Sequence, residues 1–128
     1  MVDSGKMTLT YFDLYGRAEA ARQILTHGKV EFTDARVSGP TFQAFKDSGK
    51  CPGGQVPVLE ADGICMNQSQ AIARFCAMKT GIYNSADPKA CWRDDMVINT
   101  IEDFATTMPK MENGRPTIFA MFGEAAMD

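Results

Sequence analysis

The segment QVPVLEADGICMNQSQAIARF, residues 55–75, carries the strongest structural signal in the chain. Two short runs of apolar and β-branched residues, VPVLE and ICM, flank an Asp-Gly pair at positions 62–63, which is typical of a two-residue hairpin turn. Residues 67–69 are helix-capping types, and apolar residues follow them at helical spacing. The segment therefore predicts two antiparallel strands and then a helix that runs to about Lys79.

The residues before this segment predict a β-α-β unit. Residues 7–12, MTLTYF, alternate apolar and polar side chains, as a strand with one buried face does. Residues 17–26 are rich in helix formers, and residues 30–37 predict a second strand. Because this strand returns after one helical crossover, it should lie parallel to the first. The glycine- and proline-rich residues 38–55 predict an irregular segment around one or two helical turns.

The element order β-α-β-α-β-β-α is the thioredoxin-like arrangement, so we expect an α/β domain over residues 1–82. A short all-α region should follow over residues 83–128. Asp87 and Pro88 form a capped helix start, and apolar spacing continues that helix to Pro109. The remaining residues predict at most one more short helix.

Composition narrows the range of partners. The 128 residues carry a net charge of −3, which provides no basic face for phosphates and argues against nucleic acid as a partner. Neither a signal peptide nor a run of ~20 apolar residues is visible, so we expect a soluble, cytoplasmic protein with no membrane partner. The four cysteines match neither a CxxC pair nor a zinc pattern, which predicts free thiols and no metal: Cys51, Cys65, Cys76 and Cys91.

Three motifs, in order and at the right spacing, resemble the glutathione transferases. They are TYFDLYGRAEAAR at residues 10–22, VPVL at residues 56–59 and QSQAIARF at residues 68–75. The resemblance is closest to the sigma class, which includes glutathione-dependent prostaglandin synthases and cephalopod lens crystallins. It covers residues 7–80 well and residues 87–108 more loosely. It implies a detoxification enzyme that takes glutathione as co-substrate and works as a homodimer.

For the sulfur of glutathione, the resemblance implies Tyr11 and Arg17. The Tyr11 hydroxyl would donate a hydrogen bond to the thiolate, which favours the charged, nucleophilic form. Arg17 would support the thiolate and the tyrosine electrostatically. Without the resemblance, a strand tyrosine is more often a packing residue, Tyr15 is a rival for the role, and Arg17 fits solvent equally well.

For the γ-glutamyl end and the main chain, the resemblance implies four residues. A cis bond between Val56 and Pro57 would let the tripeptide pair with Val56 as an added strand. The N-terminus of the next helix, with Gln68 and Ser69, would hold the γ-glutamyl carboxylate. The local sequence alone leaves open an ordinary trans proline and a helix cap that binds nothing.

For the glycine end and the amine, the resemblance implies residues from three further places. Lys46, with Phe42 one turn before it, matches a lysine and a tryptophan that hold the glycine carboxylate, although phenylalanine has no N–H to donate. Gln55 stands where a lysine is usual. Asp103 matches an acid that reaches the glutathione amine across a dimer interface, and a solvated helix acid is the simpler alternative.

The sequence therefore predicts conjugation of glutathione to small hydrophobic electrophiles. We expect weak turnover, because the residues after position 82 are fewer than the helical domain that forms the acceptor pocket in the family. A glutathione-binding or structural, crystallin-like protein is the alternative. Thiol-disulfide exchange is excluded, because it needs a cysteine near the first helix start and residues 11–17 contain none.

Overall fold

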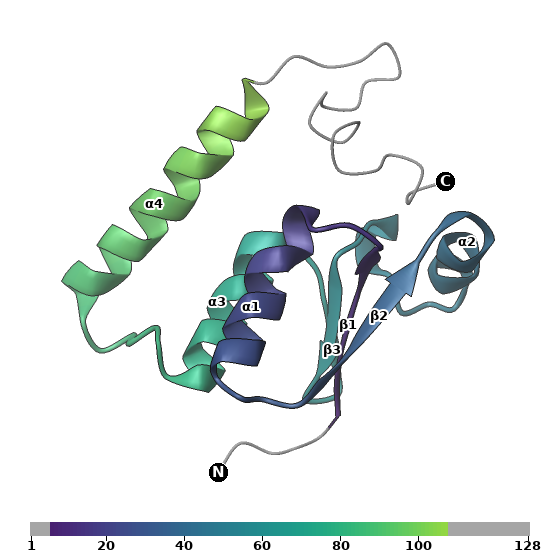
Figure 1. Ribbon diagram of the computed structural model, residues 1–128, viewed down its shortest axis with the longest axis horizontal. Helices are drawn as coiled ribbons and strands as arrows, with labels where there is room; N and C mark the ends of the chain where they lie inside the picture. The colour runs from purple at the N-terminus through teal and green to yellow at the C-terminus, as the bar shows by residue number, and fades with distance from the viewer. Residues whose placement is uncertain (1–5, 108–128) are drawn as a thin grey trace.

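The computed structural model describes residues 6–107. A four-stranded sheet in the order β2-β1-β3-β4 forms the centre of the molecule (Figure 1). β1 pairs in parallel with β2 and antiparallel with β3, where Thr10 lies opposite Val58. β3 and β4 form the antiparallel hairpin that the Asp-Gly pair predicted. The strands span Met7–Phe12 (β1), Phe32–Val37 (β2), Val58–Ala61 (β3) and Ile64–Met66 (β4).

Helices cover both faces of this sheet. α1 and α3 lie side by side on one face and α2 lies on the other, whereas α4 stands apart from the sheet (Figure 1). The predicted α/β order is confirmed by this arrangement. The helices span Glu19–His27 (α1), Gly39–Asp47 (α2), Ser69–Thr80 (α3) and Pro88–Thr106 (α4), with short 3-10 turns at Gly16–Ala18 (η1) and Pro52–Gly54 (η2).

The hydrophobic core lies between the sheet and the α1–α3 layer. Leu9 and Leu59 from the central strands, Leu25 from α1 and Ile72 from α3 are almost fully buried there. The expectation of one buried face for β1 is wrong. Thr10 is also buried, because a central strand with helices on both sides of the sheet has no solvated face.

The segment between β2 and β3 is more regular than the sequence suggested. α2 has nine residues instead of one or two isolated turns. Its first turn is held by the Ser38 amide, which donates to Thr41 Oγ1 at 2.8 Å, and Pro40 lies in that turn, where it needs no hydrogen-bond donor. Local capping therefore outweighs the glycine and proline content that indicated irregular structure.

α4 begins as predicted and ends earlier. The Asp87 side chain accepts a hydrogen bond from the Ala90 amide at 3.1 Å, and Pro88 occupies the first turn. The helix ends at Thr106 instead of Pro109. The short helix expected after residue 109 lies outside the described residues. No helix in the part that the structure describes is long and apolar enough to cross a membrane.

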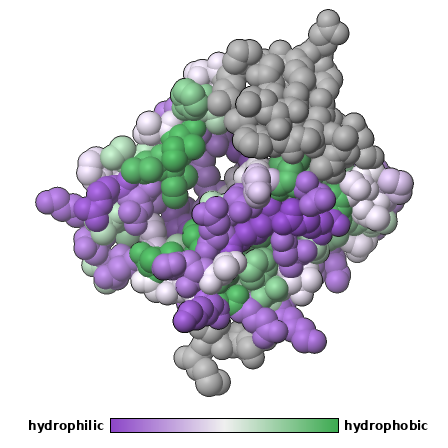
Figure 2. All heavy atoms as spheres, viewed as in Figure 1, coloured by the Kyte–Doolittle hydropathy of each residue, from purple (hydrophilic) through white to green (hydrophobic). Residues whose placement is uncertain are grey.

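α4 carries an apolar surface that no other element of residues 6–107 buries. Hydrophobic side chains gather over it in the space-filling view (Figure 2). No residue of α4 is buried, and five of its large apolar residues are exposed. The packing that holds the rest of the fold therefore does not extend to this helix. The five are Trp92, Met96, Val97, Ile101 and Phe104.

Candidate functional site

The topology brings most of the predicted site residues to one edge of the sheet. Tyr11 lies near the carboxyl end of β1, and α2 follows the carboxyl end of the parallel strand β2. Because β3 runs antiparallel to β1, its start at Val58 lies at the same edge. β4 reverses the direction again, so that the start of α3 at Ser69 returns to this edge. Open α/β sheets commonly bind ligands where parallel strands end.

The Tyr11 hydroxyl is held by the turn that follows β1. Its oxygen accepts a hydrogen bond from the Arg17 backbone amide at 3.1 Å. Gly16 allows this approach, because a Cβ at that position would lie 2.5 Å from the hydroxyl oxygen and 2.5 Å from Leu14. The φ of Gly16 is also +43°, which side chains disfavour. The site around Tyr11 therefore requires glycine at position 16.

The environment of Tyr11 keeps its proton in place at neutral pH. Burial raises the pKa of the hydroxyl above its usual value of 10. The hydrogen bond from Arg17 and the charges of Arg17 and Arg22 lower that pKa and only partly offset burial. Since the hydroxyl accepts from Arg17 and finds no acceptor for its own proton within residues 6–107, it can donate to a ligand.

The Arg17 side chain points to α4. Its guanidinium makes a two-point ion pair with Glu102, with Nη1 to Oε2 and Nη2 to Oε1 both at 3.0 Å. This hydrogen bonding raises the pKa of Arg17 and lowers the pKa of Glu102. In this structure the backbone amide of Arg17 donates a hydrogen bond to the predicted catalytic hydroxyl, whereas its side chain hydrogen-bonds to Glu102.

The N-terminus of α3 is left without a side-chain cap. Gln68 occupies the capping position, with φ 72° and ψ 107° and no side-chain hydrogen bond to the helix. The expectation that residues 67–69 cap the helix in the ordinary way is wrong, since Asn67 Nδ2 instead donates to the Pro52 carbonyl at 3.5 Å. Positive φ in a glutamine costs ~1–3 kcal/mol, and such strain is concentrated at ligand sites. Ser69 is the first helical residue, and the first-turn amides beside it are available to an anion.

The bond between Val56 and Pro57 is cis, which confirms that expectation. Pro57 is buried and Val56 is half-buried directly before β3. Gln55, which precedes them, is exposed, and its carbonyl accepts a hydrogen bond from Cys51 Sγ at 3.4 Å. The Gln55 side chain has no hydrogen bond to any of the residues that the structure describes.

Phe42 and Lys46 form one cluster on α2. The Lys46 amine lies 4.5 Å from the centre of the Phe42 ring, and this ring packs edge-on against Phe12 at 5.1 Å. No carboxylate in the described part of the chain pairs with Lys46, so its charge is available to an anionic ligand. The Phe42 ring contacts the lysine amine by a cation–π interaction but offers no N–H to a carboxylate.

Asp103 lies apart from this edge. It is exposed on α4 and is next to Glu102, which makes the pair with Arg17. Its carbonyl accepts a hydrogen bond from Thr106 Oγ1 at 2.9 Å within the same helix. The structure therefore brings Asp103 onto a solvent-facing helix and not to the edge that holds Tyr11.

Sequence reasoning missed Arg22, which is buried beside Tyr11. Its guanidinium carbon lies 5.7 Å from the centre of the Tyr11 ring. A helical signal existed, because Arg22 follows the buried Ala18 by four positions and precedes the buried Leu25 by three. The residue type instead predicted an exposed side chain, since arginine is rarely buried unless it is paired.

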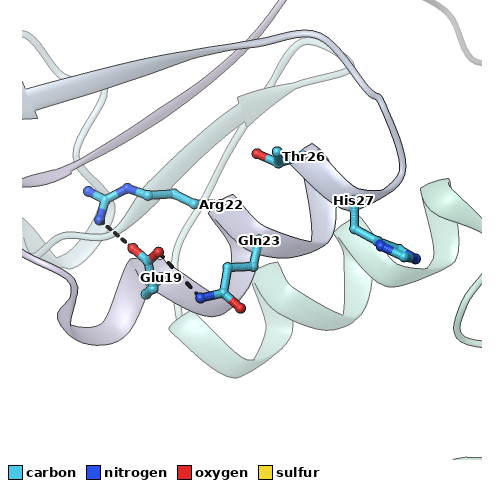
Figure 3. Close-up of a pocket in the computed structure, with 5 residues that line it drawn as sticks. All are labelled: Glu19, Arg22, Gln23, Thr26 and His27. Atoms are coloured by element: carbon cyan, nitrogen blue, oxygen red, sulfur yellow. Dashed lines mark hydrogen bonds and ion pairs between the residues drawn. The ribbon is translucent and has the colours of Figure 1, made fainter.

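A hollow of about 380 Å³ lies on the outer side of α1 and not at the sheet edge described above (Figure 3). Figure 3 shows two of the residues that line this hollow, Arg22 and Glu19, joined by a direct hydrogen bond. Within residues 6–107, no group of three potential ligand side chains could hold a metal ion. The hollow is lined by Glu19, Arg22, Gln23, Thr26 and His27.

Comparison with known proteins places these features in a family. The family model described as "Glutathione S-transferase, N-terminal domain" matches residues 7–78. Human hematopoietic prostaglandin D synthase is 32% identical over 116 residues, which are 91% of this chain and 57% of that protein. Glutathione S-transferase 2 of Caenorhabditis elegans is 39% identical over 99 residues, which are 77% of this chain and 51% of that protein. The chain thus spans about half the length of the curated relatives it matches.

Solved structures show the same likeness. A monomeric glutathione S-transferase of the hookworm Necator americanus superposes with a TM-score of 0.70 at 39% identity, over 77% of this chain and 47% of that one. The prostaglandin synthase D of Nilaparvata lugens superposes with a TM-score of 0.69 at 37% identity, over 79% of this chain and 49% of that one.

Proposed function

Because the chain belongs to the glutathione S-transferase family, we propose that it binds glutathione where β1 ends and activates the thiol for transfer to a small hydrophobic electrophile. The observation that carries this proposal is the Tyr11 hydroxyl. It accepts a hydrogen bond from the Arg17 amide at 3.1 Å, and its own proton remains to be donated. The bound thiol loses its proton to water, and Tyr11 donates a hydrogen bond to the resulting thiolate. The sulfur then forms a bond to the electrophilic carbon as the leaving group departs.

The pKa of Tyr11 supports this role. A free thiol has a pKa of ~8.5, and hydrogen bonding to the thiolate lowers that value. Burial raises the pKa of Tyr11 above 10, so the tyrosine stays protonated at the pH where the thiol ionises. Tyr11 therefore acts as a hydrogen-bond donor and not as a base.

Glutathione is proposed to lie along the edge with its γ-glutamyl carboxylate at Gln68 and Ser69. The uncapped first turn of α3 and the strained Gln68 backbone support this placement. The peptide of glutathione would pair with the backbone of Val56, beside Pro57. These contacts use the main chain, which is a common way to recognise an extended peptide.

We propose that the glycine carboxylate forms an ion pair with the Lys46 amine. Phe42 contacts that amine, and the exposed Gln55 lies at the outer edge of the proposed site. The lack of a carboxylate partner for Lys46 within the described residues supports this assignment. Lys46 is the one cation proposed to contact the glycine carboxylate, because Phe42 and Gln55 are uncharged. We therefore propose that the glycine end contributes less to affinity than the γ-glutamyl end.

The division at residue 82 separates the two halves of the proposed reaction. Residues 1–82 carry every group proposed for the thiol, and the acceptor depends on residues 83–128. We propose weak turnover for the polypeptide of 128 residues, because approximation of the two reactants contributes ~7–11 kcal/mol in well-oriented cases. Of residues 83–107, which the structure describes, α4 is the only helix, and a single helix supplies little of that approximation. A protein that binds glutathione with little turnover is the second candidate. It is favoured by Arg17, whose side chain is engaged by Glu102.

A sigma-like class and a homodimer complete the proposal. The similarity to two prostaglandin D synthases supports the class. The exposed position of Asp103 on α4 is compatible with contact to the glutathione amine of a partner copy, and the apolar residues Trp92, Met96 and Phe104 offer area for association. The hookworm relative is described as monomeric, and sedimentation distinguishes the two states. A clean monomer by sedimentation at high concentration contradicts this part.

Calorimetric titration of glutathione into the purified polypeptide, followed by conjugation to a generic aromatic electrophile, tests the proposal. We expect saturable binding of glutathione and slow conjugation. Binding without any lowering of the thiol pKa would favour the binding protein. Absence of binding would overturn the proposed function, and conjugation as fast as that of full-length transferases would overturn the proposal of weak turnover.

A further inference from the structure

Arg22 on α1 is a buried charge that the proposed reaction does not yet use. It is 5% exposed, and no other charged residue within residues 6–107 is buried. Burying a charge is unfavourable unless it is paired and hydrogen-bonded. The partners of Arg22 therefore show what its burial accomplishes.

The first set of partners is the loop that follows Tyr11. Arg22 Nη1 donates to the Leu14 carbonyl at 2.7 Å and, more weakly, to the Tyr15 carbonyl at 3.4 Å. Nη2 donates to the Phe12 carbonyl at 3.2 Å. One rigid, planar guanidinium thus binds three carbonyls in a loop of four residues.

The second set of partners orients the guanidinium. Nε donates to Asp34 on β2 at 3.1 Å, and Nη1 lies 3.2 Å from a Glu19 oxygen, the contact drawn in Figure 3. Asp34 is itself held by Arg36 at 2.8 Å. Contacts from β2 and α1 therefore hold the guanidinium in one orientation. The guanidinium in turn holds the loop by hydrogen bonds to its carbonyls.

This loop leads directly to the contact with the Tyr11 hydroxyl. Residues 12–15 continue into η1, where the Arg17 amide donates to Tyr11 at 3.1 Å. The same guanidinium lies 5.7 Å from the centre of the Tyr11 ring. Any displacement of the loop would move the Arg17 amide relative to the hydroxyl.

We propose that Arg22 is a positioning residue for thiol activation: it clamps the loop after β1 so that the Arg17 amide and the Tyr11 hydroxyl are held in place for the sulfur. This inference rests on the proposed function for its link to the thiol. The part that concerns the placement of the Tyr11 hydroxyl can be tested in the protein without glutathione.

The test uses Arg22→Lys, which keeps the positive charge but replaces the planar guanidinium, with its several N–H donors, by a single ammonium group. We expect amide hydrogen exchange at Arg17, measured by NMR without ligand, to become about tenfold faster relative to Leu9 in β1. In the glutathione complex, the pKa of the bound thiol should rise by about one pH unit. In a Tyr11→Phe background, Arg22→Lys should cause no such rise, because Arg22 acts through the tyrosine.

Arg74→Lys is the matched control. Arg74 is also paired with an aspartate, Asp95, at 3.1 Å and lies 5.9 Å from the centre of a tyrosine ring, that of Tyr83. It belongs to the α3–α4 junction, so its replacement should change neither Arg17 exchange nor the thiol pKa. If Arg22→Lys does not fold, Asp34→Ala replaces it, and a smaller acceleration at Arg17 of about two- to threefold is expected.

The outcomes separate this inference from the proposed function. Arg17 exchange that stays unchanged relative to Leu9, or a rise in thiol pKa that persists in the Tyr11→Phe background, overturns the role of Arg22. If the wild-type protein binds no glutathione, the proposed function fails. Selective acceleration at Arg17 would then still support the placement of the hydroxyl by Arg22.

Discussion

The domain from β1 to α3 and the helix α4 are held in place by different forces. In the first region, Leu9, Leu59 and Ile72 pack into a core with 1% exposure or less. α4 has no buried residue, and ion pairs between Arg17 and Glu102 and between Arg74 and Asp95 connect it to that region. Apolar burial is worth far more than partly exposed ion pairs. The difference indicates that the sheet and its three helices form the stable unit, and that α4 is attached to it weakly.

The largest expected effect compares one isoleucine from each region. Ile72 is 1% exposed on α3, and Ile101 is 62% exposed on α4. Ile72→Ala should lower the free energy of unfolding by about 2–5 kcal/mol, because it removes buried methyl groups and leaves a cavity. Ile101→Ala should change it by less than about 0.5 kcal/mol. Urea denaturation measures both, and a large loss for Ile101→Ala would show that this face of α4 is covered in solution.

The second effect concerns ligand binding, for which the first region should suffice. Ser69→Ala removes a charge-assisted hydrogen bond to the γ-glutamyl carboxylate, worth ~1.5–3 kcal/mol, so the affinity for glutathione should fall about tenfold to 150-fold. Calorimetry measures the change. The matched control is Ser85→Ala in the connection to α4, which should leave the affinity intact. An unchanged affinity in Ser69→Ala would refute the placement of the carboxylate.

The third effect concerns ionisation of the thiol. Tyr11→Phe should leave glutathione binding nearly intact and raise the pKa of the bound thiol by about one to two pH units, since the thiolate loses one hydrogen bond. The thiolate fraction at neutral pH falls as a result. Thiolate absorbance followed against pH measures the shift. Tyr15→Phe is the control, because Tyr15 is exposed, and a larger shift there would move the assignment from Tyr11 to Tyr15.

The smallest effect concerns the attachment of α4. Glu102→Gln should weaken the contact with Arg17 by about 0.2–1 kcal/mol, as expected for a partly exposed pair. Fluorescence anisotropy of Trp92, the one tryptophan of the chain, reports the motion of α4. In the wild-type protein, added salt should increase this motion. In Glu102→Gln, added salt should have a smaller effect.

The same contact has a defined pH dependence. The pKa of Glu102 is lowered in the folded protein, chiefly by its hydrogen bond from Arg17. Its contribution is therefore present above the ordinary pKa of glutamate, ~4.3, and is lost as the pH falls through the lower folded value. Trp92 anisotropy should change in this acidic range in the wild-type protein, and Glu102→Gln should lack that part of the change.

The order of strands and helices follows from local sequence. The strand at residues 7–12, the Asp-Gly turn at positions 62–63 and the Asp87-Pro88 start of α4 each depend on a few neighbouring residues, and all three elements appear in the structure as expected. The cis bond at Pro57 was expected from the resemblance, because the local sequence is equally compatible with trans. Element type and order were predictable because propensity, capping and turn chemistry depend on neighbours along the chain.

The partners of the charged side chains depend on how these elements pack. Arg17 pairs with Glu102 across 85 positions of sequence, and Arg22 is buried against carbonyls whose positions depend on the loop after β1. The helical spacing placed Arg22 on the buried face of α1, whereas an arginine side chain is usually exposed to solvent. Whether an arginine is buried depends on partners that meet it only after β1, β2 and α1 have come together. Sequence therefore determined the elements and the edge where Tyr11 lies, and tertiary packing determined which charges hold that edge in place, because ion pairs and buried hydrogen bonds form between residues that are distant in sequence.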